Sequence, residues 1–73
     1  MNMDLGQKLL LERMKFLVDI CEEYFYTTYY FKRICGDPTF FVKVGNHSTF
    51  VDLWGWTSET TLRTFLDYHA KKI

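Results

Sequence analysis

The sequence is poor in alanine, proline and cysteine, with one alanine, one proline and two cysteines in 73 residues. A chain with only Cys21 and Cys35 lacks the many paired cysteines of a small secreted disulfide scaffold. We therefore expect both thiols to be reduced and the protein to reside in the cytoplasm. The first residues lack a basic segment followed by an apolar run, so we expect no signal peptide.

Long apolar runs and an excess of one charge are also missing. The apolar segments are too short for a membrane-spanning helix, so we expect no membrane partner. Nine basic and nine acidic residues cancel, which leaves no overall field to attract nucleic acid or an anionic membrane. A chain near neutrality tends to associate, and we expect a homodimer formed through an uncovered, ring-bearing face of the sheet.

Aromatic side chains, by contrast, are abundant: two tryptophans, five tyrosines and seven phenylalanines. Each ring can bury about 150–250 Å², and a chain this short has little interior in which to place them. We therefore expect the rings to supply much of the core and the excess to form an exposed surface for a partner.

Residues 4–23 have the pattern of an amphipathic helix with Asp4 as its N-cap. The stripe expected to face the core recurs at steps of three and four residues and consists of Leu10, Met14, Leu17, Cys21 and Tyr24. A second apolar edge consists of Leu9, Phe16 and Ile20. This helix is therefore expected to cover one face of the elements that follow it.

Residues 24–34 fit two different structures. Their tyrosines, phenylalanines and threonines favour a strand, but no glycine, proline or asparagine separates them from the first helix. The basic pair Lys32-Arg33, with a glycine and a proline shortly after it, also resembles a helix C-terminus. We predict the strand; the alternative is one long helix to about residue 35, followed by a hairpin and a second helix.

Residues 39–54 predict a β-hairpin around Gly45-Asn46, because glycine at the first turn position suits a type II′ turn. This loop places Val44 opposite His47. The face expected to lie toward the core consists of Phe40, Val42, Thr49, Val51 and Leu53. The opposite face, expected to stay uncovered, consists of Phe41, Lys43, Ser48, Phe50, Asp52 and Trp54.

Residues 57–73 predict a second helix, with a threonine or serine at 57–58 as its N-cap and Glu59 in its first turn. Two lysines near the C-terminus suit the negative end of the helix dipole. The expected apolar face consists of Leu62, Phe65, Leu66, His69 and Ile73. The fold class is therefore α+β: one domain, residues 1–73, with a helix, a three-stranded antiparallel meander and a helix on the same sheet face.

Catalytic, metal-binding and phosphate-binding motifs do not stand out. Cys21, Cys35, His47 and His69 lack the closely spaced ligand pairs of structural zinc sites. Cys35 follows two cations that would favour a thiolate, but no base or orienting group can be assigned to it. We therefore expect neither an enzyme nor a bound metal or cofactor.

These features favour a small non-enzymatic protein-binding module. A composition rich in phenylalanine, tyrosine and lysine is typical of AT-rich genomes, which leads to the hypothesis of a phage or mobile-element inhibitor that occupies a surface of a host protein. Alternatives are a single-stranded nucleic-acid binder that stacks bases on the tyrosine run, and a small subunit of a larger complex. The residues expected to contact the partner are Tyr26, Tyr30, Lys32, Arg33, Phe41, Phe50, Trp54 and Trp56.

Overall fold

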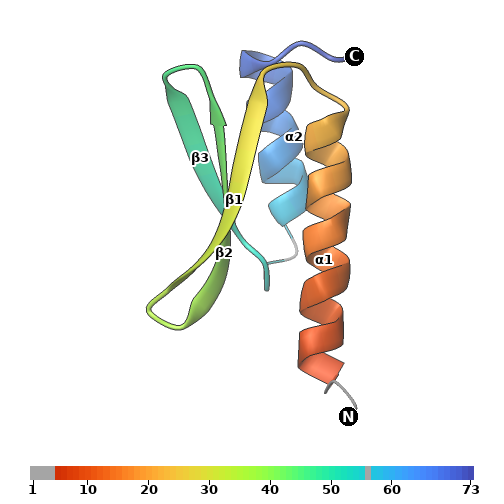
Figure 1. Ribbon diagram of the computed structural model, residues 1–73, viewed down its shortest axis with the longest axis vertical. Helices are drawn as coiled ribbons and strands as arrows, with labels where there is room; N and C mark the ends of the chain where they lie inside the picture. Colours follow the sequence, from red (N-terminus) through yellow and green to blue (C-terminus); the bar gives the residue numbers. More distant parts are fainter. Residues whose placement is uncertain (1–4, 56) are drawn as a thin grey trace.

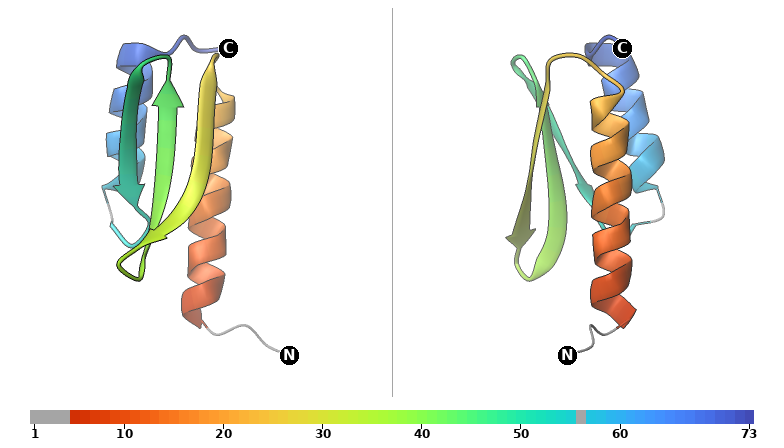
Figure 2. Two further views of the ribbon diagram at one scale, coloured as in Figure 1. Left: turned by 60° about the vertical axis from the view of Figure 1, so that its left-hand side comes forward. Right: turned by 45° about the vertical axis from the view of Figure 1, so that its right-hand side comes forward.

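The computed structural model describes residues 5–55 and 57–73 and shows two helices packed on one face of a three-stranded sheet (Figure 1). The sheet is an antiparallel meander in the order β1-β2-β3. Both helices lie on the same side of it, and no described element covers the other side (Figure 2). The predicted α+β fold is confirmed. The elements are α1 (Leu5–Glu22), β1 (Thr27–Ile34), β2 (Asp37–Val44), β3 (His47–Asp52) and α2 (Ser58–His69).

The connection after α1 decides between the two structures considered for residues 24–34. The backbone N–H of Glu23 donates to the carbonyl of Ile20 at 3.1 Å, which tightens the last turn of the helix. The helix ends at Glu22, and Tyr26 then adopts a φ of 61°, in the left-handed region, so no helix continues through it. Since β1 begins at Thr27 and pairs with β2, the strand is confirmed and the alternative of one long helix to about residue 35 is wrong.

The predicted core stripe of α1 is confirmed in its main members. Leu10, Leu17, Cys21 and Tyr24 are buried, and Met14 packs against them while partly exposed. The predicted second edge is correct for Ile20, which is buried, but wrong for Leu9 and Phe16, which are exposed. Asp4, the predicted N-cap, lies outside the described residues.

The second hairpin has the predicted register, with Val44 opposite His47 and Val42 opposite Thr49. Gly45 has a φ of 60° while Asn46 is not in the positive-φ region, as a type II′ turn requires. The strands differ from the predicted ranges at their ends only. β2 begins at Asp37 rather than residue 39, and β3 ends at Asp52 rather than residue 54.

A second two-residue turn joins β1 to β2. Cys35 and Gly36 have φ values of 51° and 87°, the pattern of a type I′ turn, whose twist suits antiparallel strands. This turn places Ile34 opposite Asp37 and fixes the register of β1. Pro38 fits in the central strand because β3 has ended opposite it, and its carbonyl accepts a hydrogen bond from the N–H of Leu53 at 3.1 Å.

The core lies between the sheet and the two helices. Four of the five residues predicted to face it from the hairpin are buried there, and the fifth, Thr49, is partly exposed. From α2, Leu62 and Leu66 are fully buried. Among the described residues, only two aromatic side chains, Tyr24 and Phe40, belong to the buried cluster. The buried hydrophobic residues are Leu10, Leu17, Ile20, Cys21, Tyr24, Phe40, Val42, Val44, Val51, Leu53, Leu62 and Leu66.

The C-terminal residues leave α2 and lie against the α1–β1 connection, as the adjacent positions in Figure 1 show. The N–H of Phe25 donates to the carbonyl of Lys71 at 2.7 Å, and the N–H of Ile73 donates to that of Glu23 at 2.8 Å. Ile73 is therefore exposed rather than part of the apolar face of the helix, which corrects the prediction. The last two lysines likewise follow the helix instead of forming its last turn.

A polar network fixes this end of the molecule. The hydroxyl of Tyr24 donates to Oδ1 of Asp67 at 2.6 Å, and the ammonium of Lys72 lies 3.5 Å from the same oxygen. Arg63 contacts Glu59 at 3.1 Å and Glu23 at 3.4 Å. These contacts connect α1, α2 and the C-terminal residues, so the acidic Glu23 has a structural role.

Candidate functional site

The uncovered sheet face carries a row of three rings, one from each strand. Tyr30, Phe41 and Phe50 are direct cross-strand neighbours, because the register pairs Tyr30 with Phe41 and Phe41 with Phe50. The rings of Tyr30 and Phe41 stack with centroids 4.9 Å apart and planes at 4°, and those of Phe41 and Phe50 lie 5.8 Å apart. We call these three residues the aromatic row. It forms a continuous apolar stripe across the sheet.

The two outer rings of the aromatic row are well exposed, with Tyr30 at 57% and Phe50 at 64% of their full accessible surface. Phe41 lies between them and is half-buried. The row forms part of the wall of a shallow groove of about 460 Å³ on the same face. The groove is lined by Ile34, Cys35, Asp37, Thr39, Phe41, Phe50 and Asp52.

Charges of both signs surround the aromatic row. The register places Lys43 on one side of it, and Lys32 and Asp52 on the other, all on the uncovered face. Asp37 also lines the groove. The two cations and two anions cancel, so this face carries no net charge. The strand register alone places these four residues there.

Four of the eight residues predicted to contact a partner are brought together on this face: the aromatic row and Lys32. Trp54 is exposed but follows the end of β3, and its backbone N–H donates to Oδ1 of Asp52 at 2.9 Å. Strand alternation therefore does not determine the direction of the Trp54 side chain. Trp56 lies outside the described residues.

Tyr26 and Arg33 do not join the other predicted contact residues. Tyr26 is highly exposed in the α1–β1 connection, before the strand begins. Arg33 pairs with Pro38 and alternates to the helix side of the sheet, where its Nη1 donates to the carbonyl of Gly36 at 3.0 Å. The period of two along β1 thus separates residues that are adjacent in sequence.

The same alternation divides the tyrosine run. Tyr29 and Phe31 lie on the helix side, where the ring of Tyr29 stacks on Phe40 with centroids 5.6 Å apart. Both remain 38% exposed because β1 is at the border of the sheet. Tyr24 is buried just after the end of α1, where the loss of solvent first and the hydrogen bond to Asp67 second raise the pKa of its hydroxyl.

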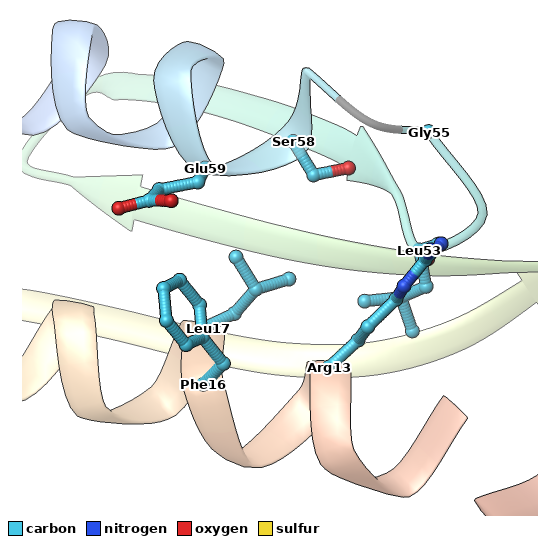
Figure 3. Close-up of a pocket in the computed structure, with 7 residues that line it drawn as sticks. All are labelled: Arg13, Phe16, Leu17, Leu53, Gly55, Ser58 and Glu59. Atoms are coloured by element: carbon cyan, nitrogen blue, oxygen red, sulfur yellow. The ribbon is translucent and has the colours of Figure 1, made fainter. Parts of the chain in front are cut away.

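A smaller pocket of about 220 Å³ lies between α1 and the β3–α2 connection (Figure 3). Nη1 of Arg13 donates to the carbonyl of Leu53 at 2.7 Å across it. The hydroxyl of Ser58 donates to the carbonyl of Asp52. These polar groups bind backbone atoms and connect the helix to the loop. The lining residues are Arg13, Phe16, Leu17, Leu53, Gly55, Ser58 and Glu59.

The thiols and imidazoles considered as ligands lie in three places. Cys21 is buried in α1, where burial first and Glu22 second raise the pKa of its thiol to about 12. Cys35 is exposed in the β1–β2 turn, and both cysteines are free. His47 and His69 meet at the opposite end of β2. Among residues 5–55 and 57–73, no three metal-ligating side chains form a cluster.

Sequence reasoning missed the groove residues Ile34, Asp37 and Thr39. The glycine at position 36 could have indicated them, because it forms a two-residue turn with Cys35. That turn fixes the register of β1 against β2. Without that register, the residues of β1 that share the uncovered face could not be assigned.

No family model matches the chain, and no curated protein or solved structure matches it significantly. Within the described part of the chain, neither helix has the length and apolar character needed to cross a bilayer. The candidate site is therefore defined by its own residues, as an aromatic row and groove on the uncovered face.

Proposed function

We propose that this chain is a non-enzymatic protein-binding module that binds another protein through the uncovered sheet face. The observation that supports this most directly is the aromatic row, which exposes Tyr30 and Phe50 around the half-buried Phe41. Exposed apolar patches on small proteins usually mark interaction sites. Tyrosine and other rings are also enriched among the residues that contribute most to binding energy at interfaces.

The charges on this face favour a protein partner over single-stranded nucleic acid. Nucleic-acid binding needs a basic groove beside the stacking rings. Here Asp37 and Asp52 line the groove, and Lys32 and Lys43 lie on the same face. A neutral surface with rings and mixed charges suits the polar rim and apolar centre of a protein interface.

The more specific form of the proposal is an inhibitor encoded by a phage or mobile element that occupies a surface of a host protein in the cytoplasm. Its support is the composition of the chain and its small size. Two free cysteines agree with a reducing compartment. We also propose that the chain forms a homodimer, since its buried core is small for a chain with this many rings.

Affinity capture with matched variants tests the proposed surface. The wild-type chain, the Phe50→Ser variant and the Tyr68→Ser variant are used as baits in a low-GC bacterial lysate, with quantitative mass spectrometry. Tyr68 is 83% exposed on α2 and serves as the control. A specific partner is retained by the control and reduced about tenfold or more by Phe50→Ser, as expected for a contact worth about 1.4 kcal/mol or more.

Equal capture by all three baits would contradict the proposed surface. Binding of an oligonucleotide that weakens steeply with salt, and that Phe50→Ser abolishes, would instead support the nucleic-acid alternative. Capture of one stoichiometric assembly that is insensitive to Phe50→Ser would support a small subunit that binds by another surface.

A further inference from the structure

β1 is a long edge strand. It has eight residues without proline, and all but the first are exposed. In the part of the chain that the structure describes, β2 is the only strand that pairs with it, so β1 forms a border of the sheet (Figure 2). An edge of this kind presents a row of backbone donors and acceptors to any strand that can align with them.

The two-residue turns show which backbone groups point outward. In such hairpins the residues that flank the turn form a hydrogen-bonded pair, so Ile34 bonds to Asp37 across β1 and β2. Hydrogen bonding alternates along the strand, so every second residue back from Ile34 also bonds to β2. The remaining residues direct their N–H and C=O groups away from the sheet: Thr27, Tyr29, Phe31 and Arg33.

We propose that a second copy of this chain pairs with this edge, β1 against β1 in antiparallel orientation, with Tyr30 opposite Tyr30 of the other copy. In this register Tyr29 lies opposite Phe31 of the other copy, and Thr27 lies opposite Arg33. All four outward residues of each copy then form hydrogen-bonded pairs, about eight backbone hydrogen bonds in total. A shift by two residues in either direction leaves three such pairs.

The cations of β1 also favour this register. Lys32 and Arg33 are adjacent near one end of the strand. Antiparallel pairing about Tyr30 places Lys32 opposite Thr28 of the other copy, so the cations of the two copies lie at opposite ends of the interface. Parallel pairing would instead bring like charges together, which is destabilising for directly opposed residues.

Pairing at β1 extends both faces of the sheet. On the uncovered face, Tyr30 meets Tyr30 of the other copy, and the two aromatic rows join into one row across six strands. On the helix side, it covers Tyr29 and Phe31, each of which is 38% exposed in the single chain. The inference rests on the proposed self-association and is independent of the partner-binding role of the uncovered face.

The edge of β3 is less suited to this pairing. It has six residues, and the same alternation leaves Ser48, Phe50 and Asp52 facing outward. The carbonyl of Asp52 already accepts a hydrogen bond from the N–H of Gly55 at 3.0 Å and another from the hydroxyl of Ser58. Within residues 5–55 and 57–73, the chain therefore caps one end of this edge itself, and the edge of β1 stays open.

Light scattering coupled to size-exclusion chromatography tests the interface with a pair of proline variants. Phe31→Pro removes an outward N–H of β1 and keeps the ladder to β2, while Ser48→Pro does the same at the edge of β3. The wild-type chain and Ser48→Pro are expected to have twice the chain mass of 8.8 kDa. Phe31→Pro is expected to be monomeric, with its fold checked by circular dichroism.

Disulfide trapping tests the register between the β1 strands of the two copies. It does not require that a proline variant folds. In a Cys35→Ser background, Tyr30→Cys places two thiols at a directly opposed pair, with Cα atoms about 4.5–5.5 Å apart, within disulfide reach. Thr28→Cys in the same background is the control, because the two copies of residue 28 are offset by about 13 Å along the strands. Cys21 is buried and remains unreactive.

With oxidised glutathione as the electron acceptor, the expected result is a covalent dimer for Tyr30→Cys and none for Thr28→Cys. A wild-type chain that is monomeric at about 100 μM, or a dimer in which Tyr30→Cys does not cross-link, would overturn the inference, since about eight backbone hydrogen bonds and the covered rings should give a Kd below about this concentration. A dimer that Phe50→Ser dissociates and Phe31→Pro does not would place the interface on the uncovered face and would overturn it as well. If a variant or lysate shows no partner capture while the dimer remains, that result contradicts the proposed function and leaves the β1 interface standing.

Discussion

The imidazole of His47, the first residue of β3, stacks on that of His69, the last residue of α2, with ring centroids 4.1 Å apart and planes at 23°. Phe65 and Tyr68 also contact the His69 ring, at 4.7 and 4.8 Å between centroids. Loss of solvent first, and the neighbouring His47 second, lower the pKa of His69 below its ordinary value of 6.5. The stack therefore favours the neutral form of the His69 ring.

This preference predicts that the fold loses stability in mild acid. Above pH 6.5, His69 is neutral in both the folded and the unfolded chain, and its full contribution is present. As the pH falls through 6.5, the unfolded chain takes up the proton first, and stability decreases until the pH passes the lowered pKa of the folded state. Urea unfolding at pH 7.5 and 5.5 measures the change. A His69→Gln variant is expected to show a smaller difference between the two pH values; an equal difference would contradict the assignment.

The same substitution is expected to lower the free energy of unfolding by different amounts on the two faces of the sheet. Phe40→Leu changes a ring that is 1% exposed in the core, and we expect a loss of about 1–2 kcal/mol in the free energy of unfolding. Phe50→Leu changes a ring on the uncovered face and is expected to stay within about 0.5 kcal/mol. Chemical denaturation compares the two. Similar losses for both variants would mean that the uncovered face contributes to the fold itself.

The buried hydroxyl of Tyr24 is expected to contribute through its hydrogen bond to Asp67. Tyr24→Phe removes the donor and keeps the ring, so we expect a loss of about 1 kcal/mol in the free energy of unfolding at pH 7. Since the pKa of Tyr24 is raised, its contribution is complete below pH 10 and decreases as the pH rises through the raised value. Tyr68→Phe, at an exposed ring, is the control and should leave stability unchanged.

The β1–β2 turn is expected to depend on backbone conformation rather than on space. A Cβ at Gly36 would meet no atom within 4 Å, but its φ of 87° is one that most side chains avoid. We therefore expect Gly36→Ala to cost about 1 kcal/mol. Gly36→Asn should cost less, since asparagine adopts this region more readily. If thermal unfolding ranked the two variants in the opposite order, the turn assignment would be wrong.

The two thiols are expected to react at very different rates. Cys35 is exposed, whereas Cys21 is buried and has a pKa of about 12. At pH 8 a thiol reagent should therefore modify one cysteine quickly and the other only when the chain unfolds. Mass spectrometry after brief labelling identifies the site. Rapid labelling of Cys21 in native conditions would indicate that α1 opens readily from the core.

Local sequence patterns determined most of the elements and one of the two hairpins. The three- and four-residue spacing in α1 predicted the buried positions Leu10, Leu17 and Cys21. Gly45 predicted the second turn, its register and the inward face of β2 and β3, because a two-residue loop leaves little freedom in strand pairing. These predictions needed only contacts between residues close in the chain.

Tertiary contacts decided what local preference left open. Residues 24–34 could form a strand or a helix, and pairing of β1 with β2 made the strand. That register then assigned Tyr30 to the uncovered face and Tyr29 to the helix side, and Arg33 away from Lys32. Composition alone indicated that the chain has more rings than so small a core can enclose, since a short chain buries a smaller fraction of its surface than a long one. Which rings remain outside depends on strand register and helix placement, which arise only when distant segments meet.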